Sequence, residues 1–175
     1  DSVLQFLALA TMTLAGCGPS LVEGGLPLLP PTVEVHKVDR SYDVHGLTRD
    51  AIGRSLAAGR IRRNDRHFTG LHTWDIRWRF RFEYGSGGCR MTDVRVRLHS
   101  EVTLPEWVDR DRAGPGLAEE WERFVRKLRA HEHRHRAIAY AAAREVERRL
   151  GGVTAPTCHG MEADANLLGQ RILDR

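Results

Sequence analysis

The sequence predicts an α+β fold in which a small antiparallel sheet packs on one long helix. Residues 73–84, TWDIRWRFRFEY, alternate aromatic or aliphatic side chains with charged ones, which is the period of a strand with one buried face. A GSGG turn follows, and residues 93–104 alternate again, so the two segments predict a hairpin. Residues 117–150 contain no Gly or Pro and end before a Gly-Gly pair, which is typical of a helix and its stop signal.

Three further segments complete the predicted secondary structure. Residues 32–44 alternate in their first half and predict another strand. Residues 48–61 predict a short helix capped by Thr48, because a threonine oxygen accepts a backbone N–H of the first turn. A second, shorter helix is predicted from about Glu162. The aromatic face of residues 73–84 is expected to belong to the core, since residues of these types are usually buried.

The N-terminal part predicts export and a tether ahead of a single domain over residues 32–175. Its apolar run is about as long as the hydrophobic core of a signal peptide and is shorter than a typical membrane-spanning helix. The run ends in LAGC, which resembles the bacterial lipobox, so residues 1–17 predict a signal peptide with lipid attached at Cys17. A plain secretory signal and an apolar core segment are the alternatives. Residues 18–31 are rich in Gly and Pro and predict the tether.

Export has two consequences for the mature chain. It places the protein in the cell envelope, held to the membrane by the lipid anchor, or outside the cell. Of the three cysteines, lipidation of Cys17 leaves Cys89 and Cys158 in an oxidising compartment, where a disulfide between them is expected. The alternative is two unrelated buried thiols.

Composition limits the choice of partners. Hydrophobic residues make up 41% and charged residues 29% of the chain, which excludes wholesale disorder. The formal net charge is +4, carried almost entirely by arginine. The arginines alternate with Asp and Glu and form no basic run interleaved with aromatic residues, so no nucleic-acid partner is predicted. Binding of anionic lipid or polysaccharide by an arginine-rich surface is one alternative for the function.

The segment RAHEHRHRAI at 129–138 carries the main functional signal. At 100° per residue, the apolar side chains of the long helix fall in a stripe roughly 120° wide. The stripe comprises Leu117, Trp121, Phe124, Leu128, Ile138, Ala142, Val146 and Leu150. His135 is predicted near its middle, His131 within it and Glu132 at its edge, whereas His133 is predicted on the opposite, charged face. Burial of ionisable groups is costly unless they are paired, and a metal ion would pair them.

The spacing of these residues is that of a zinc hydrolase. Two histidines at i and i+4 project to one side of a helix and can share Zn²⁺, so His131 and His135 are the predicted metal ligands. Glu132 is the predicted catalytic base, which takes a proton from the zinc-bound water as it attacks a peptide carbonyl. Core histidines satisfied by hydrogen bonds are the alternative interpretation.

Several motifs together resemble the DUF922 family, whose members are predicted secreted bacterial zinc-dependent proteases. The motifs are Tyr42-x-Val44-x-Gly46-x-Thr48, Thr73-Trp74-x-Ile76-x-Trp78, Cys89, Leu104-Pro105-x-Trp107, Trp121-x-x-Phe124, His131-Glu132-x-x-His135 and Cys158. The resemblance covers residues 33–175 and implies a zincin-like fold, a protease activity on peptide or protein substrates, and export. His133 departs from the family pattern, in which a small residue is more usual.

The third zinc ligand is left open. A histidine six residues after His135 is excluded because position 141 is Ala. The candidates within the chain are Glu162, Asp164 and His159. The resemblance also implies a further histidine-containing stretch after Arg175. The leading hypothesis is therefore an exported zinc metalloprotease, and the alternative is a non-catalytic envelope lipoprotein with a structural metal site or none.

Overall fold

The computed structural model describes residues 33–174 and shows an α+β fold. The elements are β1 (Val33–Val44), α1 (Arg49–Gly59), β2 (Ile61–Arg63), β3 (Arg66–Phe68), β4 (Leu71–Gly85), β5 (Gly88–Trp107), a short 3₁₀ helix (Arg110–Arg112), α2 (Pro115–Gly151), β6 (Thr154–Ala155) and α3 (Met161–Leu173). The predicted signal peptide, the lipidation site Cys17 and the tether lie outside the described residues.

The main sheet is mixed, so the prediction of an antiparallel sheet was wrong for one strand. β4 and β5 form the predicted antiparallel hairpin. β1 pairs with β5 in parallel, from Val33 opposite Val96 to Val44 opposite Trp107. The strand order is β1-β5-β4 because β5 inserts between the other two, and β6 adds a short pairing with β5. β5 takes the central place because its inward side chains, such as Leu98 and Val102, are the most completely buried of the sheet.

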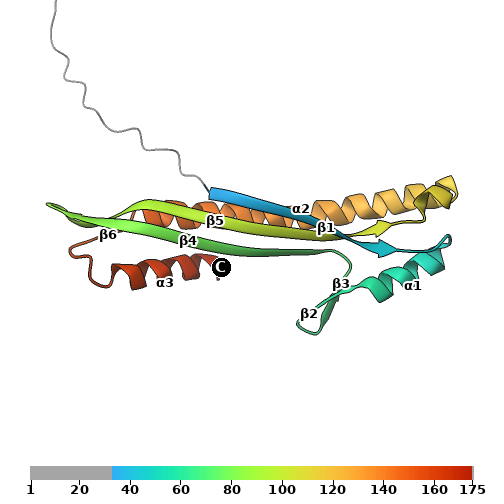
Figure 1. The fold of residues 1–175 in the computed structure, drawn as a ribbon, viewed down its shortest axis with the longest axis horizontal. Coiled ribbons are helices and arrows are strands. Elements are labelled where there is room, and N and C mark those ends of the chain that lie inside the picture. Colours follow the sequence, from blue (N-terminus) through green and yellow to red (C-terminus); the bar gives the residue numbers. More distant parts are fainter. Residues whose placement is uncertain (1–32, 175) are drawn as a thin grey trace, which may run out of the picture. The chain divides into compact units, whose positions relative to one another are not determined.

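One face of the sheet packs on α2, which runs alongside the strands (Figure 1). The main core joins this face to α2 and α3. The contributing helix residues are small or aliphatic: Ala139, Ala143, Val146 and Leu150 from α2, and Met161, Ala165 and Ile172 from α3. Alanines at successive turns of α2 allow the helix to approach the sheet closely. On α3, Gly169 likewise allows the helix to approach the sheet closely, because a Cβ atom there would lie 2.5 Å from the Trp78 ring.

The aromatic face of β4 is buried only in part. Ile76 is buried, and Trp78 and Phe80 pack against the core. Towards the hairpin tip, however, the side chain of Tyr84 is 73% exposed. The expectation that this whole face is core was therefore wrong for Trp74, Phe82 and Tyr84, which are exposed on this edge strand.

A second, smaller core closes the other end of the sheet. It contains Val44, Ile52, Trp107, Trp121 and Val125 and joins β1, α1, β5 and the first turns of α2. Helix α1 begins as predicted at Thr48, whose side-chain oxygen accepts a hydrogen bond from Ala51 N at 3.2 Å.

The predicted disulfide is confirmed. Cys89, at the start of β5, is bonded to Cys158, just ahead of α3, and the bond spans 69 positions of the sequence. It ties the segment that leads into α3 to the hairpin, next to the β5–β6 pairing. Among residues 33–174, no helix is both long and apolar enough to cross a membrane.

Candidate metal and active site

Helix α2 carries all three residues of the H-E-x-x-H motif in one continuous stretch of 37 residues. The helix begins after Gly114 with Pro115 in its first turn, where the missing N–H of proline costs nothing, and it continues to Gly151. Its buried residues are Trp121, Val125, Glu132, Ala139, Ala143, Val146, Glu147 and Leu150. This spacing makes one stripe along the helix, and Glu132 lies at its centre.

The predicted helical phase was therefore wrong for the motif. Glu132 is the buried member, at 5% exposure, whereas His131 and His135 are exposed. The prediction failed because apolar residues on the flank of α2 were counted with the core. Phe124 and Ile138 lie on that flank, and their side chains are 37% and 66% exposed. His133 is exposed, as predicted.

His131 and His135 nevertheless converge. Their Nε2 atoms are 3.1 Å apart, the ring centroids are 4.7 Å apart, and the ring planes meet at 81°. Two nitrogens bound to one tetrahedral zinc ion at 2.0–2.1 Å are about 3.3 Å apart. In the structure the two Nε2 atoms share a hydrogen bond, and their separation is close to the one that a shared zinc ion would require.

Glu132 lies beneath the loop that leads into β4. A Cβ atom on Gly70 would fall 3.0 Å from Glu132 Oε1 and 2.9 Å from Leu128 Cδ1, so a larger residue at this position would force these side chains to shift. Within residues 33–174 the structure shows no ion pair or hydrogen bond to the Glu132 carboxylate.

A buried polar cluster holds α2 to the sheet one turn after Glu132. Ser100, which is fully buried on β5, lies 2.9 Å from His72 Nε2 and accepts a hydrogen bond from Arg136 Nε at 3.1 Å. Arg136 also donates to the Val38 carbonyl at 3.1 Å and forms an ion pair with Asp39 on β1. The cluster therefore connects all three long strands with the helix that carries the motif.

His72 lies close to the histidine pair. Partial burial lowers the pKa of His72, and the positive charges of Arg136, His135 and His133 lower this pKa further. An imidazole with a lowered pKa is neutral at pH 7 and can accept or donate a hydrogen bond without adding charge to the site.

No third ligand for a zinc ion is found among the described residues. No group of three or more His, Cys, Asp or Glu side chains between residues 33 and 174 is arranged to hold a metal ion. Glu162, Asp164 and His159 are all exposed, on α3 or just ahead of it, and none of them joins the histidine pair.

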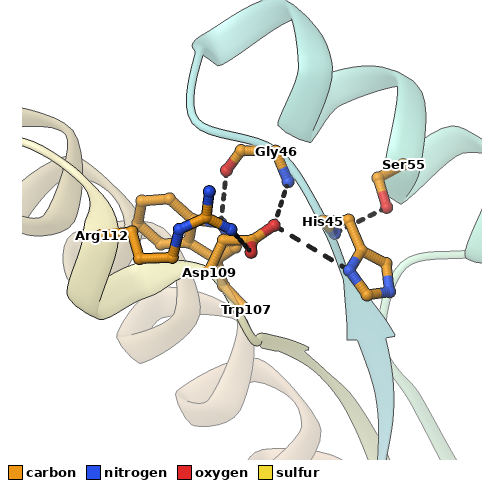
Figure 2. A network of polar contacts seen from close by, with 6 residues as sticks. All are labelled: His45, Gly46, Ser55, Trp107, Asp109 and Arg112. Carbon is orange, nitrogen blue, oxygen red and sulfur yellow. Dashed lines mark hydrogen bonds and ion pairs between the residues drawn. The ribbon is translucent and has the colours of Figure 1, made fainter.

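A separate polar network links the segment after β1 to the segment after β5, at the end of the sheet where these two strands finish (Figure 2). Asp109 Oδ2 accepts a hydrogen bond from Gly46 N at 2.8 Å, and Trp107 Nε1 donates to Gly46 O at 2.8 Å. The hydrogen bond from Gly46, followed by the charges of Arg112 and His45, keeps the pKa of Asp109 below its usual range. Gly46 adopts φ +129°, and a Cβ atom there would lie 2.6 Å from Ala51 Cβ, so the turn requires glycine.

Three of the quoted motifs, those that begin at Tyr42, Leu104 and Trp121, lie together at this end of the molecule. Tyr42 donates to the Thr69 carbonyl at 2.9 Å, Thr48 caps α1, and Trp107 packs on Trp121 with ring centroids 5.7 Å apart. A sequence profile of DUF922, described as a bacterial protein of unknown function, matches residues 39–175. The chain belongs to the DUF922 family. No curated protein and no solved structure matches it.

In this DUF922 protein, sequence analysis missed the polar cluster under α2. None of His72, Ser100 and Arg136 was among the candidate residues. A signal was present, because Ser100 falls between Leu98 and Val102 on the buried face of β5. A polar residue in the apolar phase of a strand requires a buried partner.

Proposed function

We propose that this DUF922 protein is an exported zinc-dependent peptidase in which His131 and His135 bind Zn²⁺ and Glu132 is the general base. The observation that carries the proposal is the convergence of the two Nε2 atoms, 3.1 Å apart, beside a buried glutamate of the same helix. A bound zinc ion would polarise the substrate carbonyl and lower the pKa of a water ligand to about 7. The disulfide agrees with an oxidising compartment, as expected for a protein of the cell envelope or a secreted one.

The roles of the protein groups follow from their positions. The exposed histidine pair is open to a substrate as large as a peptide. Glu132 accepts a proton from the attacking water and passes it to the leaving nitrogen. Arg136 and Ser100 position the helix against the sheet, so that Glu132 stays under Gly70.

The second candidate is a non-catalytic envelope lipoprotein with a structural metal site or none. It is favoured by the ligand set, because catalytic zinc sites hold their ion with three protein ligands, and the described residues provide two. This candidate predicts that zinc raises the melting temperature without any hydrolysis of peptides.

The experiment compares peptide hydrolysis by the zinc-loaded full chain and by two variants. Glu132→Gln should retain zinc and lose at least about 100-fold in rate, because general-base catalysis contributes 10²–10⁴-fold. His133→Gln is the matched control, since His133 lies on the same helix away from the pair, and it should retain the wild-type rate. Equal rates for the wild type and Glu132→Gln would refute the proposed base, and zinc binding without hydrolysis would favour the second candidate.

A further inference from the structure

The face of the sheet that points away from α2 carries an arginine patch, defined here as Arg77, Arg79, Arg81, Arg95 and Arg97. These positions alternate with residues of the buried face such as Val96 and Leu98, so their side chains point outward. The strand register places Arg77 directly opposite Arg97 and Arg79 directly opposite Arg95. All five side chains are exposed.

Direct pairing of like charges across two strands destabilises a sheet. Acidic neighbours offset most of this repulsion: Glu34 bonds Arg97 at 3.0 Å, Asp75 bonds Arg77 at 2.7 Å, and Asp93 bonds Arg95 at 2.8 Å. Arg79 has no ion pair or side-chain hydrogen bond with another residue of the described chain. The positive charge of Arg79 is therefore not offset by a bonded acidic side chain, and its repulsion with Arg95 on the facing strand weakens the hairpin. Such departures from sheet rules occur mostly at functional sites.

A shallow concavity lies at the unpaired arginine. The pairing of β4 with β5 shifts register between Arg79 and Arg81, and Asp93 opposite adopts a left-handed backbone with φ +47°. The concavity has a volume of about 190 Å³ and is lined by Arg79, Phe80, Arg81, Asp93 and Arg95. Asp93 lies 3.8 Å from Arg81 as well as 2.8 Å from Arg95, so it orients both guanidinium groups at the rim. The space suits a group of phosphate size that would contact Arg79.

We propose that the arginine patch binds an anionic membrane surface, with a lipid phosphate in the concavity beside Arg79. Charge complementarity supports this partner, and a row of exposed guanidinium groups on one sheet face can meet many headgroups at once. The chain also enters the domain at this place, since Val33, the first residue of β1, pairs with Val96 between Arg95 and Arg97. The proposal does not depend on zinc or on hydrolysis.

The test measures binding of the full chain to vesicles of phosphatidylglycerol and of phosphatidylcholine by co-sedimentation. The apolar N-terminal run contributes to both vesicles, so the difference between them reports on charge alone. Binding should be tighter to phosphatidylglycerol and should weaken as salt is raised. Each arginine near an anionic surface contributes about fivefold, so Arg79→Gln/Arg95→Gln should bind phosphatidylglycerol about 25-fold more weakly. The control variant Arg62→Gln/Arg63→Gln, on β2, should bind like the wild type.

Two further measurements test the role of charge at Arg79 and distinguish a lipid phosphate from a free phosphate ion. Arg79→Lys, which keeps the charge, should retain most of the binding. Inorganic phosphate at millimolar concentration should compete weakly, because one free ion replaces only one of many headgroup contacts. The proposal is overturned if the double variant binds phosphatidylglycerol as tightly as the wild type. It is also overturned if millimolar phosphate abolishes binding, or if a DNA oligonucleotide binds the patch more tightly than the vesicles do.

Discussion

Glu147 is the most strained ionisable residue of the described chain. Its side chain is 4% exposed, and neither carboxylate oxygen accepts a hydrogen bond from another described residue. Arg144 Nη1 lies 3.5 Å from Glu147 Oε2 and offsets only part of the cost of burial. Burial raises the pKa of Glu147, and the charge of Arg144 opposes the rise.

This raised pKa makes stability depend on pH in a defined direction. The folded state binds the proton more tightly than the unfolded state, so the stabilisation is complete below the ordinary pKa of glutamate. It is lost as the pH rises through the raised pKa of the folded state. Glu147→Gln removes the charge and should raise the free energy of unfolding at pH 7 by about 1–3 kcal/mol, the usual cost of an unsatisfied buried group.

Urea denaturation at pH 4 and pH 7 measures this effect. The gain from Glu147→Gln should shrink at pH 4, where the wild-type carboxyl is protonated. Glu119→Gln, at a mostly exposed site of the same helix, is the control and should change little at either pH. A Glu147→Gln protein less stable than the wild type at pH 7 contradicts the assignment.

Gly70 gives a second prediction at the residue scale. Gly70→Ala would press a methyl group against Leu128 and the Glu132 carboxylate, so it should destabilise the protein by about 1–3 kcal/mol and lower the rate of peptide hydrolysis. Thermal unfolding and the peptide assay measure both effects. Gly53→Ala on α1 is the matched control, because open space surrounds that position, and it should stabilise the helix by up to about 1 kcal/mol. Equal behaviour of the two variants would mean that Gly70 does not confine Glu132.

At the scale of elements, local sequence patterns predicted the hairpin, the three α-helices and the Thr48 cap. Each depends on neighbours in the sequence: alternation for β4 and β5, a stretch free of Gly and Pro for α2, and one side-chain oxygen at the start of α1. The parallel pairing of β1 was not predictable in this way, because it depends on contacts some 60 positions apart in the sequence.

The rotation of α2 about its own axis was the second feature that the sequence analysis predicted wrongly. The helix has more apolar residues than the sheet covers, so the sequence alone does not distinguish the covered stripe from the flank that carries Phe124 and Ile138. Glu132 at the centre of the covered stripe is unexpected for a carboxylate. It is accommodated because the small residue Gly70 leaves space above it. The structure brings the two predicted histidines, His131 and His135, together, whereas the predicted orientation of the motif on the helix was wrong.

The disulfide gives a prediction at the same scale. In the chain-entropy account, a bond that closes a loop of this length stabilises the fold by about 4 kcal/mol. The double variant Cys89→Ser/Cys158→Ser should lose most of this free energy of unfolding in urea denaturation. The reduced wild type should show a similar loss, and a loss below 1 kcal/mol for both proteins would contradict the expected role of the bond.

At the scale of the whole domain, the network around Gly46 and the candidate chemistry lie in different places. The Gly46–Trp107–Asp109 network and the small core fix the place where α1 and α2 begin. The H-E-x-x-H motif follows on α2, where the Arg136 cluster fastens the helix to the sheet. The arginine patch occupies the other face of the sheet. One domain thus offers a candidate site for hydrolysis and, independently of it, a candidate surface for an anionic membrane.

Zinc binding by the full chain is the most direct test of the account, because the peptidase proposal depends on the histidine pair. Titration of the metal-free protein should give one zinc ion per chain. His131→Ala and His135→Ala should each weaken this binding by at least about tenfold, by loss of one of few protein ligands, whereas His133→Ala should bind like the wild type. Zinc binding that is absent in the wild type, or unaffected by loss of both His131 and His135, would contradict the central claim.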